Sequence, residues 1–217
     1  TLLPVGLIIS TVLPREDVRD SFVSRKFKNI SELPEGCKVG TSSLRRRAQL
    51  LSRRPDLNIV EFRGNVQTRL RKLDEGVADA TFLACAGLSR LKLSELINPI
   101  AICDMLPAVA QGAIGIEQRE DNRQIQKFLA PIHDQETELR LLVERSFLSE
   151  LDGSCRTPIG GLAEIVKDQI IFTGEILKPD GSQIFSDTWN GSLSQAASLG
   201  RKAGLMLKEK GGEGFFK

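Results

Sequence analysis

The feature that most constrains the fold of this chain is an alternation of short apolar runs with longer polar stretches of helical spacing between Val39 and Ala84. Strands that alternate with helices pair in parallel, and the helices then cover both faces of the sheet. Ligand sites in such sheets lie at the carboxyl ends of the strands. Thr41, Arg63 and Arg90 fall at these ends, so we expect a site there.

The same segment carries an unusual concentration of positive charge. The stretch from Gly40 to Lys72 holds eight arginines and one lysine against Asp56 and Glu61, a net charge of +7 in a chain whose net charge is +2. An anion is therefore expected to bind in this part of the chain.

The Gly-Thr-Ser-Ser run that ends at Ser43 predicts a turn from a strand into a helix, with a hydroxyl residue as the helix cap. Backbone N–H groups at a helix start are free and partially positive, which favours a carboxylate or a phosphate. Arg45 and Arg46 follow in the first turn, where a cation is unfavourable for the helix dipole. A bound anion would offset that cost.

A second helix start follows the strand expected at 57–62. Arg63, Gly64 and Asn65 form its turn, and the helix carries Arg69 and Arg71. Arginine suits carboxylates because its planar fork donates two parallel hydrogen bonds and remains charged. Two such starts could face one polycarboxylate ligand. A solvated basic face or a nucleic-acid patch remains open as an alternative.

Outside this segment, the pattern predicts a strand at 5–13, a charged crossing at 14–20, and a second crossing near Gln111 that leads into a strand at 113–118. The C-terminal part reads as a small α+β domain. Its expected elements are a helix at 136–151, strands at 159–166, 169–177 and 183–189, and a helix at 194–210.

The cysteines are scattered, without a CxxC pair, and the chain has one histidine, so a zinc site is not expected. They are Cys37, Cys85, Cys103 and Cys155. Cys155 lies in a loop beside Arg156, and a neighbouring arginine favours the nucleophilic thiolate. A single cysteine in a loop more often has no functional role, so the residues alone leave open whether Cys155 is a nucleophile.

The composition predicts a soluble, cytoplasmic protein. Hydrophobic residues make up 41% and charged residues 27% of the chain, and no apolar run is long enough to cross a membrane. Aromatic residues make up 5%, with no tyrosine, so stacking platforms for nucleic acid are scarce.

Five separated segments, in this order, resemble the porphobilinogen deaminase family of tetrapyrrole biosynthesis. They are VGTSSLRRRAQL, FRGNVQTRLRKLDEG, ACAGLSRL, LPAVAQGAIGIE and LDGSCRTPIGG. The resemblance implies an α/β fold of the periplasmic-binding-protein type, two-lobed with parallel or mixed sheets, plus a small C-terminal α+β domain. It divides the chain into a remnant of a first domain (1–17 and 113–130), an anion-binding lobe (18–107) and a cofactor-attachment domain (134–217).

The resemblance also implies a function. The family are hydroxymethylbilane synthases, transferases that condense four porphobilinogen molecules into 1-hydroxymethylbilane with release of ammonia. A dipyrromethane cofactor would be attached covalently to Cys155. Its carboxylates and those of the growing chain would be bound by Thr41, Ser43, Arg45, Arg46, Arg63, Arg69 and Arg90. A non-enzymatic anion-binding module is the alternative function.

The sequence begins at Thr1, and the resemblance places the family's catalytic aspartate just before that position. The chain by itself is therefore expected to be inactive, with no catalytic residue of its own and no metal. Porphobilinogen is the expected small-molecule partner, with neither nucleic acid nor membrane. A monomer is expected, and the incomplete first domain is the surface through which it could associate.

Overall fold

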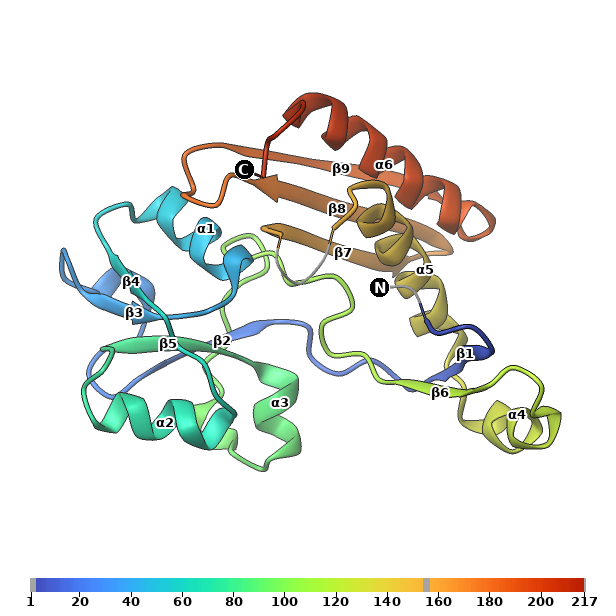
Figure 1. Ribbon diagram of the computed structural model, residues 1–217, viewed down its shortest axis with the longest axis horizontal. Helices are drawn as coiled ribbons and strands as arrows, with labels where there is room; N and C mark the ends of the chain where they lie inside the picture. Colours follow the sequence, from blue (N-terminus) through green and yellow to red (C-terminus); the bar gives the residue numbers. More distant parts are fainter. Residues whose placement is uncertain (1–2, 154–156, 217) are drawn as a thin grey trace.

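The computed structural model describes residues 3–153 and 157–216 of the chain. Figure 1 shows three parts: an α/β lobe, a strand pair with a short helix, and a C-terminal sheet backed by two long helices.

The α/β lobe is built on a four-stranded sheet in the order β2-β5-β3-β4. β3 is parallel to both β4 and β5, while β2 is antiparallel to β5. The sheet is therefore mixed, and its parallel core follows the predicted alternation. The elements are β2 (Asp20–Ser24), η1 (Ile30–Glu32), β3 (Lys38–Gly40), α1 (Leu44–Arg53), β4 (Asn58–Val60), α2 (Val66–Asp74), β5 (Ala80–Ala84), α3 (Cys85–Arg90) and η2 (Ser94–Leu96).

Helices cover both faces of this sheet (Figure 1). On the α1 side, Leu50 packs with Phe22 and Phe82 of the strands. On the other side, Leu73 of α2 and Leu88 of α3 pack in a second cluster. Burying each such side chain contributes about 1.5–3 kcal/mol, so the sheet is held from both faces.

The first strand of the chain pairs with a strand far along the sequence. β1 (Leu7–Val12) and β6 (Gly115–Arg119) form an antiparallel pair. After β6 come α4 (Arg123–Leu129) and η3 (Ala130–Ile132). Phe128 of α4 is 69% exposed.

The C-terminal part is an antiparallel sheet in the order β7-β8-β9 with two helices on one face (Figure 1). The predicted α+β arrangement is confirmed. Its elements are α5 (Gln135–Glu150), β7 (Ile159–Val166), β8 (Gln169–Leu177), β9 (Ile184–Ser192), η4 (Leu193–Gln195) and α6 (Ala196–Gly211).

Aromatic and aliphatic side chains fill the space between this sheet and its helices. Phe147 of α5 meets Phe172 of β8 edge to face, with ring centroids 4.9 Å apart. Gly200 lets α6 approach α5, because a Cβ at that position would lie 2.1 Å from the carbonyl oxygen of Val143. The close approach of the two helices therefore depends on this glycine.

Two chain segments join the α/β lobe to the remainder, and they run side by side. Leu13 N–H donates to the Ile114 carbonyl at 3.0 Å, and Glu16 N–H donates to the Gly112 carbonyl at 3.1 Å. The first segment also carries Arg15, whose side chain is buried against α5. The charged crossing predicted at 14–20 is thus partly an interior feature.

Candidate functional site

The predicted site lies where β3 and β4 end. The turn after β3 uses its own hydroxyl groups to start α1: Ser43 Oγ accepts from Arg46 N–H at 3.4 Å, which confirms the predicted cap. Thr41 Oγ1 accepts from Ser43 N–H at 3.2 Å, and Ser42 Oγ accepts from Phe62 N–H at 3.0 Å. The last bond ties the turn after β3 to the end of β4. A cavity of about 60 Å³ lies beside this turn, lined by 41–44, Arg47 and 59–61.

Arg45 and Arg46 are buried, and both bind an internal carboxylate. Arg45 Nη2 lies 2.7 Å from Asp20 Oδ2, and Arg46 Nη2 lies 2.7 Å from Asp20 Oδ1. Arg46 Nε donates to the same Oδ1 at 3.0 Å. The anion that offsets the two cations at the start of α1 is therefore supplied by the chain itself, at the first residue of β2.

Asp20 is fully buried, and burial by itself raises the pKa of a carboxyl group. The attraction of Arg46 and Arg45 outweighs this, and the pKa of Asp20 lies below its ordinary value. Asp20 is thus ionised at neutral pH. Two guanidinium groups share one carboxylate, which leaves this cluster with an excess of positive charge.

The other predicted arginines are more available to a ligand. Arg69, on α2, donates its Nε to the Gly64 carbonyl at 2.8 Å and has no carboxylate within ion-pair distance among the described residues. Burial lowers the pKa of Arg69, and the nearby charge of Arg46 lowers it further. A guanidinium remains charged despite such a shift, so Arg69 is a partly desolvated cation without a counter-ion in the described part of the chain.

Arg63 and Arg90 lie at the ends of the neighbouring elements. The Arg63 side chain is 81% exposed and pairs with Glu61 at the surface. Arg90 ends α3 and is exposed, and no ion pair involves it within residues 3–153 and 157–216. The structure therefore separates the predicted arginines into a buried pair, the partly buried Arg69, and the exposed Arg63 and Arg90.

The prediction for Cys155 lies outside the described residues. Of the other cysteines, Cys37 and Cys85 are buried and Cys103 is exposed, all as free thiols. Burial raises the pKa of Cys85 to about 11, so it is not a nucleophile at neutral pH. This fits its interpretation as a small buried hydrophobic residue.

The sequence analysis missed a second buried ion pair. Arg15 Nη1 and Nη2 lie 2.6 and 3.0 Å from the two carboxylate oxygens of Glu144 on α5. The backbone N–H groups of Ala110 and Ala163 donate to the same carboxylate at 2.7 and 2.9 Å. Glu144 thus fastens both joining segments to the C-terminal part. Its only sequence signal was a glutamate among the apolar positions of a helix.

Within the described residues, no group of three acidic, histidine or cysteine side chains could hold a metal ion. No helix in that part of the chain combines the length and apolar character needed to span a membrane.

Comparison with known proteins shows which family models and solved structures resemble this chain. The family model "Porphobilinogen deaminase, dipyromethane cofactor binding domain" matches residues 1–127, and "Porphobilinogen deaminase, C-terminal domain" matches residues 138–209. Among solved structures, the arginine-specific periplasmic binding protein STM4351 of Salmonella typhimurium is 19% identical, with a TM-score of 0.36 over 59% of each chain. R. palustris Rpa4515 with adipate is 14% identical, with a TM-score of 0.40 over 95% of this chain and 68% of the other.

Curated relatives align over the whole chain. The porphobilinogen deaminase of Paracoccus denitrificans (strain Pd 1222) is 54% identical over 217 residues, which are 100% of this chain and 69% of the relative. That of Nitrobacter hamburgensis (strain DSM 10229 / NCIMB 13809 / X14) is 52% identical over the same shares. Since family models match most of the chain and relatives match all of it, this chain belongs to the porphobilinogen deaminase family.

Proposed function

We propose that the exposed Arg63 and Arg90 and the partly buried Arg69, with the turn from Thr41 to Ser43, bind the acetate and propionate groups of the substrate and the cofactor. The observation that carries this proposal is Arg69, a partly buried guanidinium without a carboxylate partner in the described part of the chain. A desolvated cation of this kind is stabilised by a ligand carboxylate.

The activity is that of the family. The chain is a hydroxymethylbilane synthase, a transferase of tetrapyrrole biosynthesis that condenses four porphobilinogen molecules into 1-hydroxymethylbilane and releases ammonia. The alternative of a non-enzymatic anion-binding module is not favoured by the family models. Each substrate unit adds two carboxylates, so the growing chain needs several fixed cations.

The donor set fits the dipyrromethane cofactor that this family carries. When bound, dipyrromethane supplies the covalent anchor on which the product is assembled. Its carboxylates suit Arg69, which has no carboxylate partner among the described residues, and the exposed guanidinium of Arg90. Hydrogen bonds to charged groups contribute about 1.5–3 kcal/mol each, so a few of them hold such a ligand firmly. We assign Cys155 as the residue to which it is attached.

Arg45 and Arg46 take part in the proposal through their charge. Their N–H groups are largely occupied by Asp20, by backbone carbonyls and, for Arg45, by Gln49. We therefore propose that they hold a fixed positive charge behind the turn from Thr41 to Ser43, and that Ser43 presents the backbone of that turn to a carboxylate.

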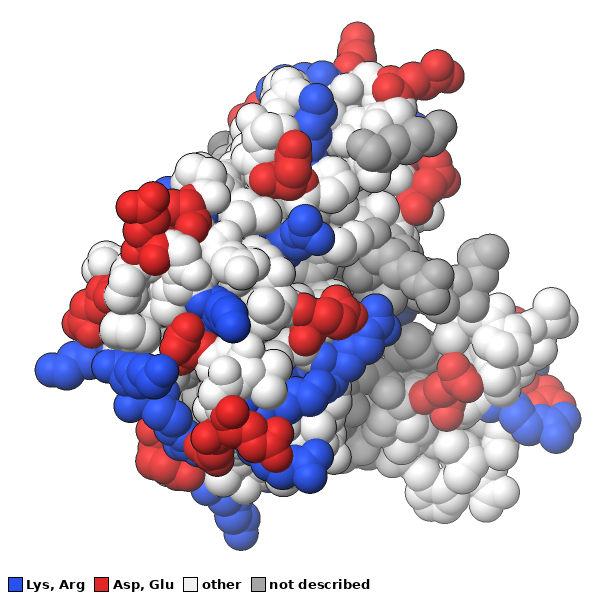
Figure 2. Space-filling view, turned by 60° about the vertical axis from the view of Figure 1, so that its left-hand side comes forward, with Lys and Arg blue, Asp and Glu red and all other residues white. Residues whose placement is uncertain are grey.

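The proposal extends to the setting of the protein. Porphobilinogen is its small-molecule partner. The protein is a monomer in the cytoplasm and binds neither nucleic acid nor membranes. In support, Figure 2 shows basic and acidic side chains intermixed on one side of the α/β lobe, where a nucleic-acid surface would be uniformly basic. We also propose the division into 1–17 with 113–130, 18–107 and 134–217, which the separate sheets support.

A pair of substitutions on one helix tests the site. Arg69→Leu removes the cation that has no carboxylate partner in residues 3–153 and 157–216, and Arg71→Leu removes an exposed arginine that pairs with Glu75. Titration calorimetry with porphobilinogen should show a loss of affinity of about tenfold or more for Arg69→Leu. The Arg71→Leu control should bind as the unsubstituted chain does. Equal binding by both variants would refute the assignment of Arg69.

The attachment residue has a separate test. Intact mass with peptide mapping should find a dipyrrole-sized adduct on the peptide that contains Cys155, and none on peptides with Cys37, Cys85 or Cys103. Reversible carboxylate binding by a protein that never carries the adduct would favour the binding-module alternative.

A further inference from the structure

The buried arginine pair reaches a second carboxylate, which comes from the C-terminal sheet. Arg45 Nη1 donates to Gln49 Oε1 at 3.0 Å, and Gln49 Nε2 donates to Glu175 Oε1 at 2.8 Å. Because a guanidinium only donates, the amide oxygen of Gln49 must face Arg45 and its NH₂ must face Glu175. The amide therefore joins the guanidinium to the carboxylate in one fixed order.

The place of Glu175 in the fold makes this a contact between parts of the molecule. Gln49 lies on α1 of the α/β lobe, and Glu175 lies on β8 of the C-terminal sheet. The turn between β8 and β9 also packs against α1: Gly181 has φ +76°, and a Cβ there would lie 2.6 Å from Ser52 N. α1 is thus held against the C-terminal sheet at two points.

Charge counting gives Glu175 a role beyond packing. Asp20 carries one negative charge against the two positive charges of Arg45 and Arg46. An ionised Glu175 brings this buried group to neutrality, whereas a protonated Glu175 leaves it with one excess positive charge. Burial lowers the pKa of Arg45, and the negative charges of Asp20 and, to a smaller extent, Glu175 oppose that shift.

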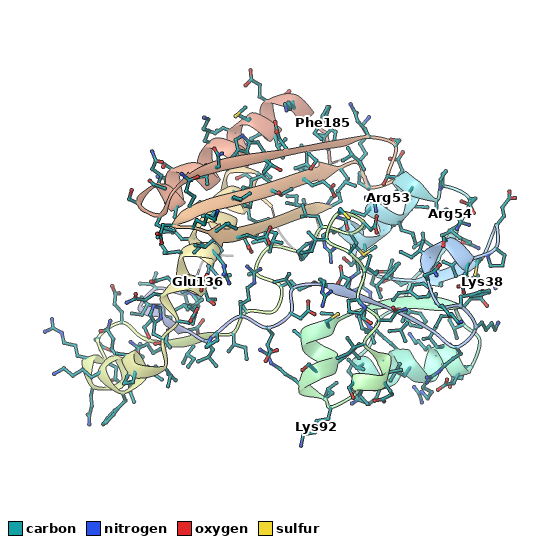
Figure 3. All side chains as sticks on the ribbon, turned by 180° about the vertical axis from the view of Figure 1, so that it is seen from behind. Lys38, Arg53, Arg54, Lys92, Glu136 and Phe185 are labelled. Atoms are coloured by element: carbon teal, nitrogen blue, oxygen red, sulfur yellow. The ribbon has the colours of Figure 1, made fainter. Side chains whose placement is uncertain are left out.

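The surroundings of Glu175 let it change its charge. A cavity of about 130 Å³ adjoins it, lined among others by Arg53, Cys103 and Asp104. Figure 3 shows Arg53 where α1 approaches the C-terminal sheet. Burial raises the pKa of Glu175, while the hydrogen bond from Gln49 and the charges of Arg53 and Arg45 partly oppose this. Glu175 therefore takes up a proton at a higher pH than an ordinary glutamate.

We propose that Glu175 is a positioning residue of the anion site: through Gln49 it holds Arg45 in place, and its charge sets the positive field that the buried arginine pair exerts at Arg69. The link to the site is electrostatic: Arg45 and Arg46 lie in the first turn of α1, next to the turn from Thr41 to Ser43, and the charge of Arg46 also acts on Arg69. This inference rests on the proposed function, because it takes Arg69 as a ligand of the substrate carboxylates.

The sign of the effect follows from the charge. Loss of the negative charge at Glu175, by protonation or by substitution, increases the positive field and tightens the binding of an anion. Glu175→Gln keeps the size and an acceptor oxygen for Gln49, so the variant should fold. Because the folded protein raises the pKa of Glu175, ionisation of this group costs stability as pH rises. The variant should therefore be no less stable than the parent at neutral pH.

The experiment measures porphobilinogen affinity at low salt by titration calorimetry, at about pH 8 and about pH 5.5, a range in which the substrate carboxylates stay ionised. At the higher pH, Glu175→Gln should bind about twofold to fivefold more tightly than the parent. At the lower pH the difference should shrink, because a larger fraction of the parent then carries a protonated Glu175. Glu164→Gln, an exposed glutamate on neighbouring β7, is the matched control and should change nothing.

A second variant, Glu175→Leu, removes the charge and the acceptor together. It should melt at a lower temperature than Glu175→Gln yet also bind more tightly than the parent at the higher pH. Equal or weaker binding by both variants at that pH would overturn the inference. If Arg69→Leu abolishes binding while Glu175→Gln leaves it unchanged, the proposed site stands and this inference alone fails. If the parent does not bind porphobilinogen, both the proposed site and the role of Glu175 are refuted.

Discussion

The molecule contains two buried arginine–carboxylate centres, and they differ in charge balance. At Glu144, one guanidinium meets one carboxylate in a bidentate pair, and two backbone N–H groups donate to the remaining acceptor positions. At Asp20, two guanidinium groups meet one carboxylate. Both carboxylates are fully buried. The Glu144 centre is neutral and suited to holding joining segments, whereas Asp20 and its two arginines carry one excess positive charge, which Glu175 offsets when it is ionised.

The largest loss of stability is expected for Asp20→Asn, which changes the charge of the Asp20 centre. It removes the carboxylate that both buried guanidinium groups contact, and removing one partner of a buried ion pair costs about 3–5 kcal/mol. The free energy of unfolding, measured by urea denaturation, should fall by that amount. Since the folded protein lowers the pKa of Asp20, its stabilising contribution is present above the ordinary aspartate pKa and is lost as pH falls through the lowered value.

The pH dependence supplies the control for that prediction. The parent should lose stability in acid more steeply than Asp20→Asn, so the two unfolding free energies should converge at low pH. Parallel curves would show that Asp20 is not the ionised counter-ion of Arg45 and Arg46.

The neutral centre is tested by Arg15→Leu. This leaves Glu144 buried with two backbone donors, so the loss of unfolding free energy should be smaller, about 2–4 kcal/mol. The matched control is Arg119→Leu, which removes an exposed arginine that pairs with Asp121, and should cost less than about 1 kcal/mol. Porphobilinogen affinity should change little, because this centre holds no excess charge. A strong loss of affinity in a folded Arg15→Leu protein would remove the distinction between the two centres.

The two centres also show what the sequence could and could not reveal. The alternation of strands with helices predicted the parallel strands β3, β4 and β5, and a serine or threonine cap was correctly expected at the start of α1, where Ser43 provides it. Such features depend on neighbours along the chain. The strand expected at 57–62 forms only from Asn58 to Val60, because Phe62 already belongs to the turn that Ser42 ties down.

The carboxylates could not be foreseen in the same way. Asp20 lies far along the chain from Arg45, and Glu144 lies further still from Arg15, so only the folded arrangement brings each pair together. Spacing alone showed that Arg45 and Arg46 needed an anion, but not that the chain provides one. For the same reason the sequence placed Arg45, Arg46 and Arg69 in one group, although the structure buries two and leaves one without a counter-ion in its described residues.

The smallest effect is expected at Gln111, which touches both centres. Its backbone carbonyl accepts from Arg15 Nε at 3.0 Å, and its side-chain Nε2 donates to Asp20 Oδ1 at 3.1 Å and to the Val18 carbonyl at 2.6 Å. Gln111→Leu removes only the side-chain bonds, so it should cost about 1–2 kcal/mol of unfolding free energy. In double-mutant cycles, the effects of Gln111→Leu and Asp20→Asn on the unfolding free energy should not be additive, because the two side chains share a hydrogen bond. The effects of Gln111→Leu and Arg15→Leu should be additive, because Arg15 contacts only the backbone carbonyl of Gln111, which the substitution keeps. If the effects of Gln111→Leu and Arg15→Leu on the unfolding free energy were not additive, the two centres would be energetically linked through Gln111. The difference in charge between the centres could then not be assigned to the Asp20 centre alone.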